Sequence, residues 1–299
     1  MSTVETLTSS YTWTLKPKEY VELAKPRIST MVLITVTLGF LIGSTQTTDW
    51  MVLLHTLIGV TLAACSSNSL NQLIERRTDA LMPRTADRPL PSGRLASLEV
   101  ALFGIFCGIV GITYLFLNVN TAAALATLAT LLIYVGVYTP LKRVTSFCTA
   151  IGAIPGALPP VIGYVAAGQP LDLGAFSLFV IMFLWQFPHF LAIAWLYRQQ
   201  YHAAGLRMLP GGIPQPGITG FMAVGYALAL LPLSLLPYHL GMAGPTYFAL
   251  AAMLGMLYLA YSVRFMLSEN RNNARGLLRC SLIYLPILLI ALTWSHLAA

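Results

Sequence analysis

The sequence predicts an all-α membrane protein with nine transmembrane helices. Of its 299 residues, 57% are hydrophobic and 9% are charged, which leaves too little polar surface to coat a globule in water. A hydrocarbon core about 30 Å thick requires about 20 apolar residues per helix, and nine stretches of the chain meet that length. The lipid bilayer is therefore the expected solvent of the fold.

Nine apolar stretches follow a short polar amino-terminal segment, residues 1–27. They run from Ile28 to Ser44, Met51 to Ile74, Leu95 to Leu117, Thr121 to Tyr138, Val144 to Ala167, Leu173 to Leu196, Ile218 to Pro237, Pro245 to Met266 and Leu277 to Ala298. The polar segment has no apolar run of signal-peptide form, so we expect the first span to be retained. Residues 28–299 are predicted to form one membrane domain.

The basic residues fall in alternate connections between the spans. All 17 Lys and Arg lie before the first span or in and next to the connections that follow the second, fourth, sixth and eighth, while the opposite connections carry Asp49 and Asp172 and no Lys or Arg. The positive-inside rule makes the basic side cytoplasmic. We expect the amino terminus and the longer loops on the cytoplasmic side of a bacterial plasma membrane, with the carboxyl terminus opposite. The basic residues form no stripe with base-stacking aromatics, so nucleic acid is not an expected partner.

Three oxygen-bearing side chains lie at the end of the second span. Asn71, Glu75 and Asp79 are spaced i, i+4 and i+8, so on a helix they share one face within about 80°. Two carboxylates and an amide provide hard oxygen ligands, which suit a Mg²⁺ ion that also keeps water and binds the phosphate oxygens of a substrate. The spacing therefore predicts a magnesium site and, with it, a diphosphate substrate.

Positive charge is available near these three side chains. Arg84 and Arg88 follow in the next loop and Lys142 follows the fourth span, where they can hold a diphosphate and stabilise it as it leaves. The alternative is that Glu75 and Asp79 simply pair with nearby arginines on a solvated helix end. A cluster of Ser and Asn between residues 66 and 71 favours a site, because polar groups at membrane depth are costly and usually face a cavity or a partner.

The fifth span is rich in glycine and proline, with six such residues between Gly152 and Gly163. Proline lacks the backbone donor that continues a helix, and its ring clashes with the preceding turn. We therefore expect this span to be kinked or locally unwound. A membrane tolerates such backbone only where it borders protein or a cavity.

The sixth span is aromatic, and its histidine, His189, follows a proline that can free a helical carbonyl. His189 is a candidate for proton transfer or for contact with a heme iron, with a hydrogen-bonded packing role as the alternative. Trp185 and Phe187 of this span, with Tyr134 and Tyr138 of the fourth, could line an apolar tunnel whose ring faces attract an allylic carbocation. The alternative for each ring is helix packing or an interfacial belt.

Six motifs spread from Lys25 onward resemble those of one known family. They are AKPR (24–27), N-x3-E-x3-D-x2-M-x-R-T-x2-R-P-L-P-x-G (71–93), YTPLKR (138–143), GAIPGALPPVIGY (152–164), WQFPHF (185–190) and Y-x2-A-G-x2-M-L-P (201–210). The family is the heme O synthases, or protoheme IX farnesyltransferases, within the UbiA-type intramembrane prenyltransferases. The resemblance implies nine helices around a central cavity and Mg²⁺-dependent transfer of a farnesyl group from farnesyl diphosphate to a vinyl group of heme b, with water added to give heme O.

The resemblance also implies roles for individual residues. Those expected to be catalytic are Asn71, Glu75 and Asp79, which look like the metal–diphosphate motif, and Tyr138 and Lys142, which look like a Y-x3-K element. The expected diphosphate contacts are Arg84, Arg88, Lys142 and Arg198. The expected heme or prenyl contacts are His189, Trp185, Phe187, Tyr134, Gln200 and Tyr201.

The chain departs from the family pattern in two places. Gln199 and Gln200 stand before Tyr201, where the family usually places one or two acidic residues, and Cys148 stands where the family commonly has Asn. Glutamine offers a neutral carbonyl oxygen but no charge. The departure leaves open how many Mg²⁺ ions bind.

Two other functions remain open at this stage. The chain could prenylate an aromatic or quinone precursor instead of heme. It could also be a transporter or a non-catalytic assembly factor for terminal oxidases, although transporters favour charges at the midplane of the membrane rather than at its surface. Heme A synthase or the oxidase assembly machinery would be the expected protein partners of a heme O synthase.

Overall fold

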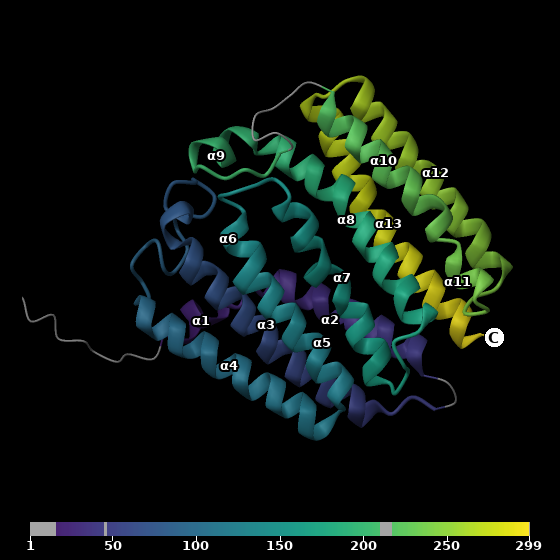
Figure 1. Ribbon diagram of the computed structural model, residues 1–299, viewed down its shortest axis with the longest axis horizontal. Coiled ribbons are helices and arrows are strands. Elements are labelled where there is room, and N and C mark those ends of the chain that lie inside the picture. The colour runs from purple at the N-terminus through teal and green to yellow at the C-terminus, as the bar shows by residue number, and fades with distance from the viewer. Residues whose placement is uncertain (1–15, 45–46, 210–216, 299) are drawn as a thin grey trace, which may run out of the picture.

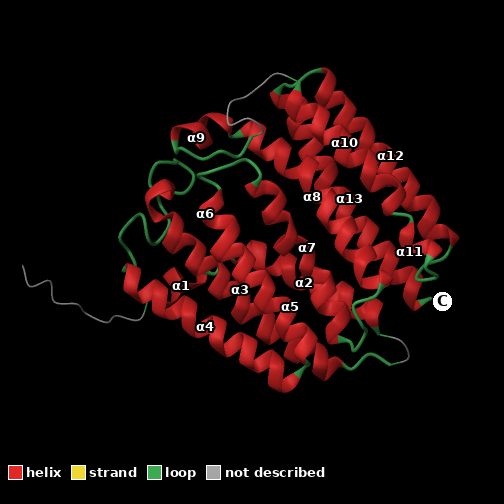
Figure 2. Ribbon diagram, in the orientation of Figure 1, coloured by secondary structure: helices red, strands yellow, loops and turns green. Residues whose placement is uncertain are grey.

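The computed structural model describes residues 16–44, 47–209 and 217–298 (Figure 1). Within these residues the chain consists of helices and loops, with no strand (Figure 2). The helices are α1 (Pro17–Leu23), α2 (Pro26–Gly43), α3 (Trp50–Asp79), α4 (Ser97–Asn118), α5 (Thr121–Leu132), the π-helix η1 (Ile133–Tyr138), α6 (Thr139–Leu141), α7 (Cys148–Ala166), α8 (Leu173–Leu196), α9 (Arg198–Ala203), α10 (Ile218–Leu233), α11 (Leu236–His239), α12 (Pro245–Leu267) and α13 (Arg271–Leu297).

The predicted number of spans is confirmed. Among the described residues, nine helical segments are long and apolar enough to cross a membrane. Two of these segments are composite, because Thr121–Leu141 joins α5, η1 and α6, and Ile218–His239 joins α10 and α11. The prediction from apolar length therefore found every one of these spans but not the π-helical turn within the fourth.

Two helix ends lie further out than the apolar stretches predict. Helix α3 continues to Asp79 rather than ending at Ile74, and α13 begins at Arg271 rather than at Leu277. Both extensions are polar, and the backbone bonds that hold a helix do not require apolar side chains. The extension of α3 matters for function because it keeps Glu75 and Asp79 on a regular helix.

The fifth span is not locally unwound. Helix α7 runs without interruption from Cys148 to Ala166 through three prolines. The buried Gln186 of α8 donates from Nε2 to the carbonyl oxygen of Ala153 at 3.1 Å, so a side-chain hydrogen bond joins α8 to this helix. Of the two alternatives predicted for this span, a kink or local unwinding, the unwinding is wrong, because each proline removes a single backbone donor and the helix continues past it.

Helices α2 and α7 pack backbone against backbone at the centre of the bundle. A Cβ atom added to Gly39 of α2 would collide with the carbonyl oxygen of Pro160, and one added to Gly163 of α7 would collide with the carbonyl oxygen of Val36. Small residues permit this approach, and van der Waals packing then drives helix association in lipid. Helices α3, α4 and α5 lie on one side of this pair, and α8, α10, α12 and α13 lie on the other (Figure 1).

Three loops rich in basic residues meet at one end of the bundle, which we call the basic end: residues 80–96, 142–147 and 197–209. Side chains join them to one another. Arg84 Nη2 donates to the hydroxyl of Tyr201 at 2.8 Å, and Arg207 Nη1 donates to the carbonyl oxygen of Val144 at 3.1 Å. The basic end is therefore a connected structure rather than three independent loops.

Gly39→Ala should destabilise the protein by about 1 to 3 kcal/mol, because the added methyl group forces the α2 and α7 backbones apart. Gly225→Ala on α10 is the matched control, since a Cβ there meets nothing within 4 Å. Thermal unfolding of the two variants in detergent measures the difference. Equal melting temperatures would show that the α2–α7 contact does not hold the bundle together.

Candidate active site

The last turns of α3 present three polar side chains to the interior of the basic end. Asn71, Glu75 and Asp79 are 2%, 8% and 1% exposed. Such burial is incompatible with the alternative of a solvated helix end. The i, i+4, i+8 spacing thus places two carboxylates and an amide on one buried face, as the sequence predicts.

Each of these three side chains has one basic partner, and each partner comes from a different segment. Lys142 Nζ lies 2.7 Å from Glu75 Oε1, and Arg88 Nη1 lies 2.7 Å from Asp79 Oδ2. Distances this short mark charge-assisted hydrogen bonds. Lys25 Nζ donates to Asn71 Oδ1 at 3.2 Å. The carboxylates therefore pair with Lys142 and Arg88, which were expected to bind diphosphate, and not with Arg76, Arg77 or Arg84.

Lys25 is a site residue that the sequence did not single out. Its φ angle is +50°, in the left-handed region that a lysine rarely adopts, and it immediately precedes α2. Strained backbone of this kind persists where the surrounding structure enforces it, often at functional sites. The AKPR motif was the one available signal, but it gave no indication of where the side chain would point.

Two amines of the cluster have shifted pKa values. Burial, together with the nearby charges of Arg88 and Lys142, lowers the pKa of Lys25 to about 8. Burial would also lower the pKa of Lys142, but Tyr138 and the Glu75 carboxylate outweigh it and raise the pKa above its ordinary value. Lys142 is therefore held as a cation, which a role on a leaving diphosphate requires.

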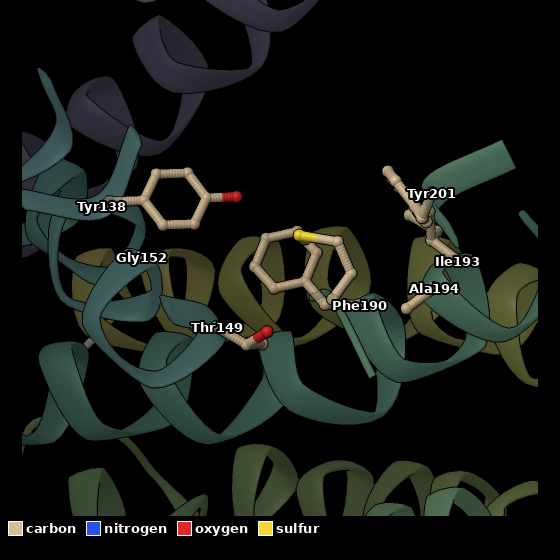
Figure 3. A pocket seen from close by; sticks show the side chains of 8 residues that line it. Tyr138, Thr149, Gly152, Phe190, Ile193, Ala194 and Tyr201 are labelled. Carbon is tan, nitrogen blue, oxygen red and sulfur yellow. The ribbon is translucent and has the colours of Figure 1, made fainter. Parts of the chain in front are cut away.

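A small, mostly apolar cavity of about 140 Å³ lies beside this cluster. Its lining residues are Tyr138, Thr149, Gly152, Phe190, Ile193, Ala194, Tyr201 and Met208. Figure 3 shows the Tyr138 ring directed into the space toward Phe190, with the Thr149 hydroxyl below it. The Lys142 amine lies 4.4 Å from the centroid of the Tyr138 ring, so this ring connects the charged cluster to the cavity.

Gly152 of α7 makes room for the Tyr138 ring. A Cβ atom at this position would lie 2.5 Å from Cε2 of Tyr138. Gly152 therefore shapes the cavity wall without unwinding α7.

Arg84 and Arg198 are not brought to the carboxylates. The Arg84 guanidinium lies 4.8 Å from the ring centroids of both Tyr197 and Tyr201, and Arg198 folds back over Trp195, donating to the carbonyl oxygen of that residue at 2.7 Å. Arg84 thus joins the loop after α3 to the segment around α9. Of the arginines expected to bind diphosphate, Arg88 alone contacts the cluster.

The aromatic residues expected to form a tunnel are divided among different environments. Tyr134 lies beside Tyr138, with ring centroids 5.4 Å apart. Phe187 stacks on Tyr226 of α10 at 3.8 Å, and Trp185 Nε1 donates to the carbonyl oxygen of Ser281 in α13 at 2.9 Å. Of the four residues, Tyr138 lines the cavity described above.

His189 is oriented by two neighbours. Its ring stacks on Trp185 with centroids 5.0 Å apart, and its Nδ1 lies 2.8 Å from Ser281 Oγ. The Ser281 hydroxyl also lies 2.7 Å from the carbonyl oxygen of Leu278. Ser281 thus holds the Nδ1 side of the ring, and Nε2 is the nitrogen left for another contact.

The Y-x2-A-G-x2-M-L-P motif contributes Tyr201 to the cavity wall, and Gln200 precedes it in α9. The carbonyl oxygen of the Gln200 side chain, Oε1, is buried and has no hydrogen-bond partner. An unsatisfied buried acceptor requires an explanation. A bound water or cation near α9 would supply one.

The donor set of the α3 cluster fits a hard divalent cation. Asn71 offers its carbonyl oxygen, and Glu75 and Asp79 offer carboxylates. Mg²⁺ is typically held by one or two carboxylates, with water and substrate phosphates completing an octahedron. The described residues contain no group of three or more His, Cys, Asp or Glu arranged to hold a metal, so this ion would depend on its substrate for further ligands.

The fold and the position of the cluster define a class of protein, the intramembrane prenyltransferases. Residues 32–292 match the UbiA prenyltransferase family, and the chain belongs to that family. A solved structure of digeranylgeranylglyceryl phosphate synthase superposes with a TM-score of 0.82 at 20% identity, covering 95% of this chain and 99% of that one. A UbiA homologue from Archaeoglobus fulgidus bound to DMAPP and Mg²⁺ superposes at 0.68 with 17% identity, covering 94% and 100%. At such identities the likeness concerns the fold.

Curated relatives are more similar in sequence. The protoheme IX farnesyltransferase of Solibacter usitatus is 44% identical over 280 residues, which cover 91% of this chain and 96% of that protein. The protein of the same name from Myxococcus xanthus is 41% identical over 279 residues, covering 92% and 93%. The chain is therefore similar to these proteins over nearly its whole length.

Lys142→Met should destabilise the protein by about 3 to 5 kcal/mol, because it leaves the buried Glu75 carboxylate without a counter-charge. Adding Glu75→Gln to this variant should recover most of the loss. Thermal unfolding of both proteins in detergent provides the measurement. A double variant no more stable than Lys142→Met would contradict the assignment of the two residues as a buried pair.

Proposed function

We propose that this protein is a heme O synthase, which transfers the farnesyl group of farnesyl diphosphate to a vinyl group of heme b. The observation that carries the proposal is the 44% identity, over 91% of the chain, to a relative named protoheme IX farnesyltransferase. The paired cluster on α3, beside an aromatic cavity, provides the matching chemistry. An anionic head group would bind at the basic end, and an apolar chain would extend into the bundle.

Asn71, Glu75 and Asp79 would hold Mg²⁺, which supplies positive charge to the diphosphate when it is bound. The basic partners of these residues would also bind the diphosphate. Lys142, Arg88 and Lys25 donate hydrogen bonds to the cluster, and they lie where the same donors can turn to the oxygens of a diphosphate. Their charge stabilises the negative charge that develops as the C–O bond breaks.

Tyr138 is placed to act on the organic half of the substrate. Its ring lines the cavity and lies beside Lys142, so the negative ring face can stabilise the allylic cation left by the departing diphosphate. The heme vinyl group forms a C–C bond to that cation. Water then adds to the adjacent carbon, and its released proton leaves with the diphosphate, giving a hydroxyethylfarnesyl side chain.

Heme would be held near α8 and α9. His189, whose ring stacks on Trp185, would supply an imidazole nitrogen as an iron ligand or a proton acceptor, and Tyr201 lines the cavity next to Gln200 in α9. Arg84 and Arg198, which contact aromatic rings at the basic end, would attract the anionic substrates by long-range electrostatics. Phe187 and Tyr134 would support this arrangement by packing.

The distribution of charge supports an orientation in the membrane. The 17 Lys and Arg lie in the three loops of the basic end, before or at the start of α2, at the end of α3 and around the α12–α13 turn. We therefore assign the basic end to the cytoplasm of a bacterium. Substrates would enter from that side. Heme O would pass to heme A synthase or to a terminal oxidase under assembly.

Asp79→Ala should abolish formation of heme O, because it removes a metal ligand and leaves Arg88 unpaired. Mass spectrometry of hemes extracted from membranes that express each variant measures the farnesyl-plus-water adduct of heme b. Asp49→Ala is the matched control, since it removes a carboxylate that caps the opposite end of the same helix. Heme O at the wild-type level in Asp79→Ala would refute the site.

A second assay, with purified protein, separates the rival functions. Purified protein given farnesyl diphosphate with either heme b or 4-hydroxybenzoate should prenylate heme b. Prenylation of the benzoate instead would identify an enzyme for aromatic precursors. Diphosphate left intact with both acceptors would point to a transporter or an assembly factor.

A further inference from the structure

The π-helical turn η1 places a buried threonine next to the cluster on α3. Thr139 is 2% exposed and follows directly after η1. Both its backbone N–H and its side-chain hydroxyl donate to the carbonyl oxygen of Tyr134, five residues earlier, the hydroxyl at 2.8 Å. Single π-helical turns in α-helices occur frequently at functional sites.

The second contact of the Thr139 hydroxyl is with Asn71. A hydroxyl has one proton, and in Thr139 that proton is directed to the Tyr134 carbonyl. Toward Asn71 the oxygen must therefore accept, and Asn71 Nδ2 donates to it at 3.1 Å. This contact fixes which end of the amide faces Thr139.

The opposite side of the same amide gives an independent constraint. Lys25 Nζ lies 3.2 Å from Asn71 Oδ1, and an ammonium group can only donate. Lys25 therefore requires the carbonyl oxygen on its side, just as Thr139 requires the amino group on the other. The hydrogen-bond network, which is what decides an amide orientation, allows a single assignment.

We infer that Thr139 is a positioning residue that holds the Asn71 carbonyl oxygen toward the metal-binding cluster. The inference rests on the proposed function, since it concerns the Mg²⁺ that the cluster would bind. An amide turned by half a rotation would present N–H groups to the cation and could not coordinate it. Lys25 enforces the orientation only while its amine remains on Asn71, whereas Thr139 can enforce it after that amine has turned to the diphosphate.

Mn²⁺ binding tests this role without relying on turnover. Purified full-length protein in detergent, with inorganic diphosphate present, is titrated with Mn²⁺, and the free ion is followed by electron paramagnetic resonance. Thr139→Val keeps the shape of the side chain and removes the hydroxyl. It should weaken Mn²⁺ binding by about 10-fold or more, as loss of a group that orients a metal ligand typically does.

Two further variants separate positioning from packing. Thr139→Ser restores the hydroxyl and should bind Mn²⁺ like the wild type. Thr127→Val is the matched control, because Thr127 is a buried threonine of α5 whose hydroxyl bonds to the Ala123 carbonyl at 2.7 Å. This variant should lose a comparable hydrogen bond and leave Mn²⁺ affinity unchanged. If Thr139→Val does not fold, Thr139→Ala takes its place.

The possible outcomes distinguish the inference from the function on which it rests. Weak Mn²⁺ binding in Thr139→Val, with farnesyl transfer restored by excess Mg²⁺, supports the positioning role. Equal affinity in Thr139→Val and the wild type overturns it alone, as does weak binding in Thr139→Ser. A wild-type protein that binds no Mn²⁺ overturns the metal site and this inference together.

Discussion

A carboxylate buried in an apolar bundle has to be neutralised, and this requirement organises the basic end of the protein. Glu75 and Asp79 lie on the buried face of α3, where an unpaired charge would cost several kcal/mol, on the order of 3 to 5. Their counter-charges come from the loop after α3, through Arg88, and from the segment after α6, through Lys142. Neutralising the carboxylates therefore fixes where these segments converge, and the cavity lies beside that point.

The same pairing explains how a site for an anion can be assembled from acidic residues. A cluster of carboxylates alone would repel diphosphate, and a cluster of amines alone would unfold the helix ends by mutual repulsion. Because each ligand residue carries its own basic partner, the cluster is close to neutral before substrate arrives. Binding of a metal–diphosphate pair replaces one set of ion pairs with another, so little reorganisation of charge is needed in a low-dielectric interior.

The sequence predicted the features that follow from regular periodicity. Apolar length gave the nine spans, and the spacing of Asn71, Glu75 and Asp79 gave the shared face of α3. The sequence did not predict the side-chain positions that depend on irregular backbone. Lys25 reaches Asn71 through a left-handed φ angle, and Thr139 reaches it through a π-helical turn. An α-helical pattern places neither side chain correctly. The pairing of Phe187 with Tyr226 depends on packing between α8 and α10, which one sequence does not encode in any local pattern.

The centre of the bundle argues for a fixed site rather than a moving one. Transport by alternating access requires one group of helices to rock against another around the substrate. Here α2 and α7 meet at Gly39 and Gly163 so closely that even a methyl group would collide with the facing backbone. These helices stand between the two halves of the bundle, so sliding or rocking would break the contacts that hold the halves together. A rigid centre with its polar cluster at one end suits an enzyme, because catalysis by positioning requires that Asn71, Glu75 and Asp79 keep their places relative to Tyr138 while the substrates change.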